Sequence, residues 1–231
     1  MSLACPNFIG NLAPGLCRAV DDYCQLTGPG LDAETMNAWS NGAFLVAALA
    51  AWRLLSIHPN AKAHLAIRAL TLIAVLAGVG GYLFHRMDAP WAKWGETVPL
   101  LAFMLLYVWL LLRRFFHWHF LFAIPALLLY FAAIYWLEVM TPGHAPFGRA
   151  LNLPTLIVFL LASIGFLLRQ REAFWPMFWA LVTLMASSVA SMADVPICPQ
   201  LGLGSHFVWH LLDALLLYLL LRLAILHAPK R

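Results

Sequence analysis

Seven long apolar segments dominate this sequence, and they restrict the folds that the chain can adopt. Each has close to the ~20 residues that a helix needs to cross the ~30 Å hydrocarbon core of a bilayer. To within a few residues, they lie at 35–57, 66–86, 96–112, 119–140, 151–168, 173–192 and 206–226. We therefore predict an all-α integral membrane protein, built as a bundle of seven transmembrane helices.

The composition supports a chain that resides in a membrane. Of its 231 residues, 63% are hydrophobic and 10% are charged, whereas a soluble domain has about 25% charged residues. In a membrane protein the distribution of Lys and Arg reports topology, so the formal net charge of +4 does not indicate a nucleic-acid partner. We expect the lipid bilayer as a partner and no nucleic acid.

The sequence outside the apolar segments divides the chain into three parts. Residues 1–33 are rich in Cys, Pro and Gly and lack the apolar core of a cleavable signal peptide, so they predict an irregular cap outside the membrane. Residues 34–227 form the transmembrane domain, and residues 228–231 form a short basic tail.

The basic residues predict how the chain is oriented. If the N-terminus lies outside, in a periplasm or lumen, ten of the 14 Lys and Arg residues lie on the cytoplasmic side. This asymmetry favours an outer N-terminus and a cytoplasmic C-terminus. Nine of the ten acidic residues then fall in the outer half, with Glu172 as the exception. That bias suggests a polar or cation-holding site on the outer side.

Three ionisable residues share one face at the start of the last apolar segment. His206, His210 and Asp213 are spaced i, i+4, i+7, which places them on one side of a helix. Two histidines one turn apart commonly offer two ligands to a metal, although they can also simply hydrogen-bond to a neighbouring helix. His85 ends the second span at the same membrane level, and the remaining histidines lie in or near loops or helix ends. We predict a three-histidine metal site.

The chemistry of such a site follows from the ligand count. Three imidazoles on zinc leave a fourth position for water, and zinc lowers the pKa of that water to about 7. Glu96, which opens the third span, is placed to hold or deprotonate the water, although a Glu there also complements the helix dipole. Asp213 is a candidate to orient a ligating imidazole.

The first span also begins with polar side chains at this level. Glu34, Asn37 and Asn41 share a helical face, and Ser40 lies beside them. The cysteines Cys5, Cys17, Cys24 and Cys198 all lie outside in the predicted topology, where disulfides are permitted. A bridge between Cys24 and Cys198 is plausible, with Cys5–Cys17 as a second pair, but spacing does not determine pairing.

Four motifs in this order resemble those of the alkaline ceramidases, members of a seven-helix membrane hydrolase superfamily that also includes adiponectin-receptor-like proteins. Residues 33–41 (AETMNAWSN) resemble AE-x-x-N-x-x-SN, and residues 81–85 (GYLFH) resemble S-x-x-FH. Residues 96–99 (ETVP) resemble D-E-L-P, and residues 206–210 (HFVWH) resemble H-x-W-W-H.

The resemblance implies a zinc-dependent hydrolase that cleaves the amide of ceramide, or of a ceramide-like lipid, to a sphingoid base and a fatty acid. The residues carried over for the zinc centre are His85, His206 and His210 as ligands, Glu96 as the catalytic carboxylate, and Ser40 and Asn41 around them. The resemblance also implies a calcium site involving Asp22 and Glu34, and a Cys24–Cys198 disulfide.

The chain departs from the family pattern in several places. Gly81 stands where the family has a serine, and Glu96 is one methylene longer than the family's aspartate. Gln25 and Thr27 lack the carboxylates that favour calcium. Two alternatives therefore stay open: a receptor-like or lipid-binding protein with a structural zinc, and a proton-coupled transporter that uses His206, His210 and Asp213. The transporter fits less well, because the ionisable residues gather at one end and no paired repeats are evident.

Overall fold

The computed structural model describes residues 23–24, 33–62, 65–87, 90–140 and 148–227. Within these ranges there are helices and no strand, and seven helical spans are long and apolar enough to cross a membrane. The spans are Glu34–Ser56, Leu65–Met87, Trp91–Phe115, Phe120–Met140, Leu151–Arg169, Arg171–Leu201 and His206–Leu226. The all-α seven-helix prediction is confirmed, and the chain is a multi-pass membrane protein. The side on which each terminus lies stays a prediction.

The helices follow one another with short connections. The first span is made of α2 (Ala33–Ser40) and α3 (Gly42–Ser56), and the short α4 (Pro59–Lys62) follows it. Next come α5 (Leu65–Met87) and α6 (Pro90–Leu110), which ends in a π-helical turn, η2 (Leu111–Phe115). The chain finishes with α7 (Phe120–Met140), α8 (Gly148–Arg169), α9 (Arg171–Leu201) and α10 (His206–Leu226).

Two helices are longer than the sequence predicts. Helix α6 begins at Pro90 rather than near residue 96, because proline suits the first turn of a helix, where its missing N–H is not needed. Helix α9 continues to Leu201 rather than ending near residue 192, although Pro196 and Pro199 lie inside it. Both extensions lie at the end of the bundle where α5 ends and α6 and α10 begin, which we call the histidine end.

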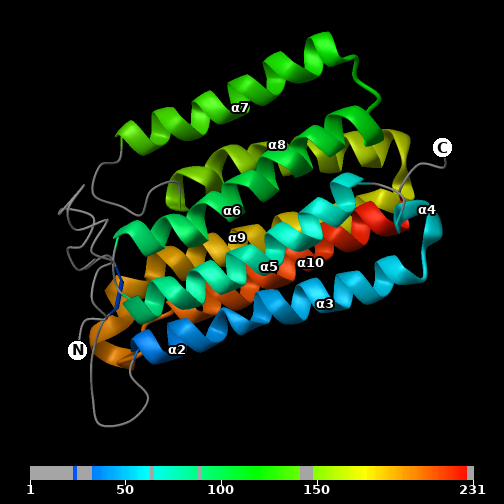
Figure 1. Ribbon diagram of the computed structural model, residues 1–231. Coiled ribbons are helices and arrows are strands. Elements are labelled where there is room, and N and C mark those ends of the chain that lie inside the picture. Colours follow the sequence, from blue (N-terminus) through cyan, green and yellow to red (C-terminus); the bar gives the residue numbers. More distant parts are fainter. Residues whose placement is uncertain (1–22, 25–32, 63–64, 88–89, 141–147, 228–231) are drawn as a thin grey trace.

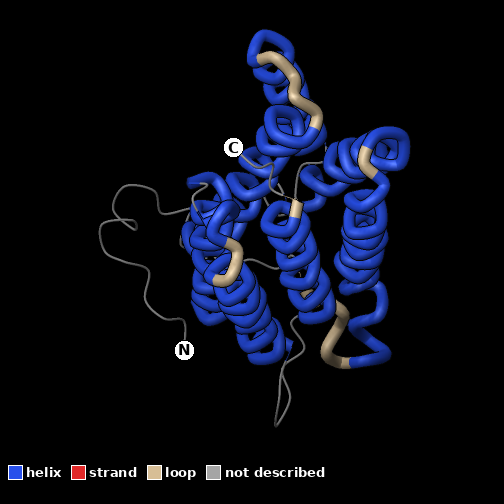
Figure 2. The backbone as a smooth tube through the Cα atoms, turned by 90° about the vertical axis from the view of Figure 1, so that its right-hand side faces the viewer, coloured by secondary structure: helices blue, strands red, loops and turns tan. Residues whose placement is uncertain are grey.

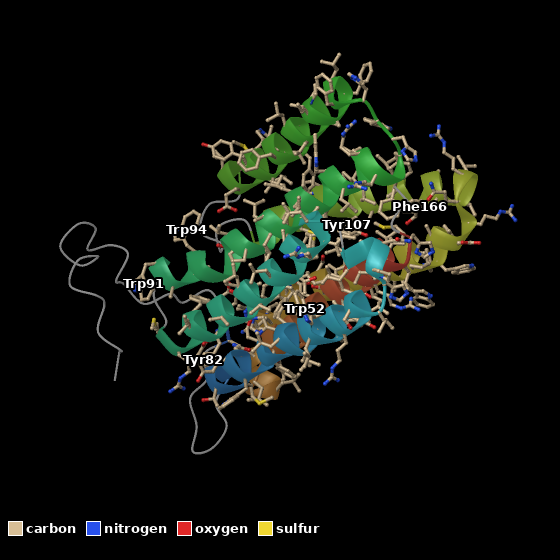
Figure 3. All side chains as sticks on the ribbon, turned by 45° about the vertical axis from the view of Figure 1, so that its right-hand side comes forward. Trp52, Tyr82, Trp91, Trp94, Tyr107 and Phe166 are labelled. Carbon is tan, nitrogen blue, oxygen red and sulfur yellow. A yellow bond between two sulfur atoms is a disulfide. The ribbon has the colours of Figure 1, made fainter. Side chains whose placement is uncertain are left out.

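The seven spans differ in how deeply they lie in the bundle. Helix α10 is the most buried of the described spans and α7 is the least buried. Helix α10 runs beside α5, and α7 lies at the edge of the bundle, at the top of the view (Figure 1). The same helix stands apart at the top of Figure 2. Large aromatic side chains fill the interior, among them Tyr107 and Phe166, which are fully buried. Trp91 and Trp94 lie toward the start of α6, and Tyr107 lies further along the same helix (Figure 3).

An apolar cavity lies between α7 and α8. Its volume is about 340 Å³, and its lining includes Leu129, Tyr130, Trp136 and Ile157. The Tyr130 hydroxyl lies 2.6 Å from the Thr155 hydroxyl, a hydrogen bond that joins the two helices beside this cavity. Many large apolar side chains on the outside of the bundle are exposed, as expected for surfaces that contact lipid tails.

Helices α5 and α6 touch backbone to backbone near the histidine end. A Cβ atom added to Gly80 would lie 1.8 Å from the carbonyl oxygen of Gly95, so no larger residue fits there. Close approach through small residues is a common way to pack membrane helices. This crossing lies five residues before His85 and one residue before Glu96, and it holds those two side chains close together.

Replacing Gly80 with alanine is expected to destabilise the protein by more than about 2 kcal/mol, because the added methyl overlaps backbone that cannot rotate away. The matched control is Gly42→Ala, since a Cβ atom at Gly42 meets nothing within 4 Å. The thermal unfolding midpoint of the purified protein in detergent measures both. Equal midpoints for the two variants would contradict the backbone contact.

Candidate metal centre

Three histidines from two distant parts of the chain meet at the histidine end. His85 comes from the last turn of α5, and His206 and His210 come from the first two turns of α10. One ring nitrogen from each lies within 4.8 Å of the others, and each residue is at most 4% exposed. The ring centroids are 4.5–5.1 Å apart. The predicted convergence is confirmed, and the group is able to bind a metal ion.

Glu34 on α2 orients the His85 ring. Its Oε2 atom lies 2.8 Å from Nδ1 of His85. A carboxylate accepts a proton, so this contact selects the tautomer that carries hydrogen on Nδ1. Nε2 of His85 then keeps its lone pair, and this buried atom has no hydrogen-bond partner. A carboxylate behind an imidazole is the usual outer partner of a metal-bound histidine.

Ser40 orients the His210 ring. Its hydroxyl donates to the carbonyl oxygen of Asn37 at 2.8 Å, and its Oγ lies 2.7 Å from Nδ1 of His210. Because the hydroxyl proton is already used, Oγ accepts from the Nδ1–H of His210. The amide nitrogen of Asn41 lies further from Nδ1, at 3.4 Å. Nε2 of His210 is left with its lone pair directed into the centre.

The carboxylate of Asp194 on α9 fixes the start of α10, which carries His206. It accepts backbone N–H bonds from Ser205 at 2.7 Å and from His206 at 2.8 Å. These N–H groups open the helix and have no intrahelical partner, so Asp194 serves as an N-cap supplied by the neighbouring helix. It also accepts the backbone N–H of Cys24 at 2.8 Å. The Tyr23 ring lies over the His206 ring, with centroids 3.9 Å apart.

Glu96 lies beside the ring nitrogen of His210 that is left free to bind a metal. Its Oε1 lies 3.3 Å from Nε2 of His210, the nitrogen that faces the metal position, and the residue is 2% exposed. Oε1 has no hydrogen-bond partner. Buried polar atoms without partners are costly, and here three of them, on His85, His210 and Glu96, gather at one point. A metal ion and its water would satisfy all three.

The donor set suits zinc. Neutral imidazole nitrogens bind zinc at about 2.0–2.1 Å, and three of them leave one tetrahedral position open. In a tetrahedral zinc site two such nitrogens lie about 3.4 Å apart, so the ring nitrogens, which lie within 4.8 Å of one another, would have to move closer together to bind the ion. Glu34 and Ser40 already hold two of the rings in the required tautomer.

The structure places the other expected site residues as follows. Asp213 accepts a hydrogen bond from the Ser187 hydroxyl on α9. The His85 ring is oriented by Glu34, and the His210 ring is oriented by Ser40. Asn41 is buried and donates to the carbonyl oxygen of Asn37. Asp22, the other expected calcium residue, lies outside the described residues.

The space beside Gly81 is filled by its neighbours. A Cβ atom there would lie 2.0 Å from Oδ1 of Asn41 and 2.8 Å from Oε1 of Glu96. The chain therefore has no room for the family's serine in this arrangement. Asn41 and the longer Glu96 side chain occupy the volume that a serine would take.

A disulfide joins the segment before α2 to the end of α9. It links Cys24 and Cys198, whose Cα atoms are 5.4 Å apart, and it confirms one of the two expected bridges. Cys5 and Cys17 lie outside the described residues. The bridge fixes Cys24 beside Asp194, and hence Tyr23 beside His206.

Sequence reasoning missed Lys93, Asp194, Tyr23 and Ser187 as residues of this region. Lys93 and Asp194 lie just outside the apolar segments, so the sequence places them in the connections between spans. A signal for Lys93 was available: it precedes Glu96 by three residues, the spacing of side chains on one helical face. Comparisons of the chain with protein-family models, curated proteins and solved structures found no match.

Proposed function

We propose that the protein is a zinc-dependent membrane amidase that hydrolyses the amide bond of ceramide or a ceramide-like lipid. The observation that carries this proposal is the buried group of three histidines with the Glu96 carboxylate 3.3 Å from one of them. The lipid class comes from the resemblance to alkaline ceramidases. It is consistent with a site in a bundle whose outer faces are apolar.

Each side chain has a role in this hydrolysis. His85, His206 and His210 would hold the metal, which supplies hydroxide near neutral pH. Glu96 takes a proton from the attacking water and passes it to the nitrogen of the leaving amine. The water oxygen forms a bond to the carbonyl carbon, the C–N bond breaks, and its electron pair stays on the nitrogen. Glu34 and Ser40 keep two imidazoles in position throughout.

A second candidate is a lipid-binding or receptor-like protein that keeps the metal as a structural element. The filled space at Gly81 favours it, because the hydroxyl that the family carries there has no counterpart at that position. Such a protein would bind ceramide without turning it over.

The test is to incubate the purified, zinc-loaded protein with N-palmitoyl-sphingosine in detergent micelles and to quantify sphingosine and palmitate by mass spectrometry. The amidase releases the two products in equal amounts, and 1,10-phenanthroline stops the release. Binding of the lipid without release of sphingosine would favour the second candidate. A protein that neither binds nor cleaves the lipid would refute both.

A further inference from the structure

Asn41 carries a buried carbonyl oxygen beside the candidate metal centre. The residue lies at the turn between α2 and α3 and is 0% exposed. Its amide nitrogen donates to the carbonyl oxygen of Asn37 at 2.9 Å. Its Oδ1 atom must therefore face away from Asn37, because the reverse orientation would bring two acceptors together. This oxygen has no hydrogen-bond partner among the described residues, which is costly for a buried polar atom.

The common local role of an asparagine does not account for this oxygen. An asparagine that precedes a helix usually accepts a backbone N–H of the first turn. Asn41 directly precedes α3, yet its side chain makes no such bond. Its Oδ1 lies instead against Gly81 on α5, where an added Cβ atom would be 2.0 Å away. The fold thus leaves the oxygen free and provides the space for it.

Glu96 brings a second such oxygen to the same point. Its Oε1 lies 2.8 Å from the Cβ position of Gly81, so it is no further from Oδ1 of Asn41 than the sum of the two distances. The two oxygens do not bond to each other, and neither has a partner in the part of the chain that the structure describes. Both are acceptors when Glu96 is ionised. One donor group with two hydrogens, placed between them, would satisfy both.

Both side chains also lie against the ring of His210. The amide nitrogen of Asn41 is 3.4 Å from Nδ1 of that ring, and Oε1 of Glu96 is 3.3 Å from Nε2. The two oxygens are therefore at the centre where the proposed hydrolysis takes place. The carbonyl oxygen of an amide accepts hydrogen bonds and cannot satisfy either atom, whereas the amide nitrogen carries a hydrogen and gains another when it leaves.

We propose that Oδ1 of Asn41 accepts the N–H of the scissile amide and makes the site selective for amides over esters. The inference rests on the proposed amidase function. The hydrogen bond holds the nitrogen beside Glu96. After the water oxygen bonds to the carbonyl carbon, Glu96 gives the nitrogen the proton that it took from the water. The C–N bond breaks, its electron pair stays on the nitrogen, and the leaving amine donates to both oxygens.

An ester lacks the hydrogen that this arrangement requires. It would place an oxygen with lone pairs against Oδ1 of Asn41, and the buried acceptor would stay unpaired. A site built to bond a substrate N–H discriminates strongly against an analogue without it. The cost of one unpaired buried acceptor corresponds to about 10–10²-fold in affinity.

Two other roles for Asn41 make different predictions. If Oδ1 only packs against Gly81, its removal changes stability and leaves selectivity alone. If it holds the attacking water, its removal slows amide and ester hydrolysis alike. Two ceramide analogues with phosphorus in place of the carbonyl carbon separate these cases: a phosphonamidate, which keeps the N–H, and a phosphonate, which has oxygen there. The two have the same charge and nearly the same shape.

The experiment titrates both analogues calorimetrically into zinc-loaded wild type and into Asn41→Leu, which has a side chain of similar size. We expect wild type to bind the phosphonamidate about 10–10²-fold more tightly than the phosphonate, and the variant to bind them within about 2-fold of each other. The variant should also lose about 10–10²-fold in kcat/KM for ceramide, with little change for the ester analogue of ceramide. Asn41→Ala gives the same comparison if the Leu variant does not fold.

Thr71→Val is the matched control. It removes a buried hydroxyl that bonds within α5 to the carbonyl oxygen of Ile67, 14 residues before His85, and it should behave as wild type. Equal affinities for the two analogues in wild type, or an unchanged preference in Asn41→Leu, overturns the role of Asn41. Equal loss of amide and ester turnover also overturns it and leaves the amidase function intact. If wild type cleaves no ceramide but prefers the phosphonamidate only when Asn41 is present, the amidase function fails and the N–H site stands.

Discussion

On the proposed function, a His210→Ala protein is expected to lose metal binding and amidase activity together. His210 supplies a buried ring nitrogen to the three-histidine group, and Ser40 holds that ring with Nε2 directed inward. Two remaining imidazoles bind zinc too weakly to keep it through purification. Without the metal, water at neutral pH supplies almost no hydroxide, so ceramide turnover should fall by at least about 10³-fold. Mass spectrometry of total metal and of released sphingosine measures both effects.

The control for this change is His119→Ala, which removes an exposed histidine before α7. It should keep one zinc per chain and normal turnover. His85→Ala and His206→Ala should behave like His210→Ala. A His210→Ala protein that kept both its zinc and its turnover would rule out His210 as a ligand.

Glu96→Gln is expected to retain metal binding and to lose most of the proposed amidase activity. Glutamine preserves the size of the side chain but cannot take a proton from water, and loss of a general acid–base group typically costs 10²–10⁴-fold in rate. We expect kcat to fall by at least about 10²-fold, while zinc content and ceramide affinity change little. Initial rates of sphingosine release measure kcat, and a parallel metal analysis measures the zinc content.

Glu172→Gln is the matched control, since it changes an exposed glutamate at the start of α9, and it should be as active as wild type. If Glu96→Gln turned over ceramide at the wild-type rate, the proton transfers would have to be assigned elsewhere. Loss of zinc in Glu96→Gln would instead make Glu96 part of the metal-binding group.

The seven-helix bundle and the convergence of the histidines were predictable from sequence, because the thickness of a bilayer sets the length of each spanning helix. A span needs about 20 residues, which sets the ends of the second and seventh spans closely enough to place His85 and His206 at the same level before any packing is known. Helical periodicity then places His210 one turn further along the face of His206.

The partners of each imidazole were not predictable, because they depend on how the helices rotate against one another. Asp213 shares a face with His206 by spacing, yet it lies two turns deeper and meets Ser187 on α9. Glu34 was expected as a calcium ligand, and the packing of α2 against α5 brings it to His85. No periodicity argument relates residues on different helices.

Lys93 and Asp194 escaped prediction for a different reason. Both residues lie outside the most apolar stretches of the chain, so the sequence predicts that the third span begins near residue 96 and that the sixth ends near residue 192. In the folded chain both helices continue, because their charged side chains are paired inside the bundle: Asp194 with three backbone N–H groups, and Lys93 over two aromatic rings. Hydropathy cannot distinguish a charge buried in this way from one in a loop.

X-ray absorption at the zinc edge of the purified protein tests the central claim most directly. We predict about one zinc per chain, with three imidazole nitrogens at about 2.0–2.1 Å and one further oxygen ligand. A protein that takes up no zinc, or whose zinc lacks histidine scattering or shows sulfur ligands, would contradict it.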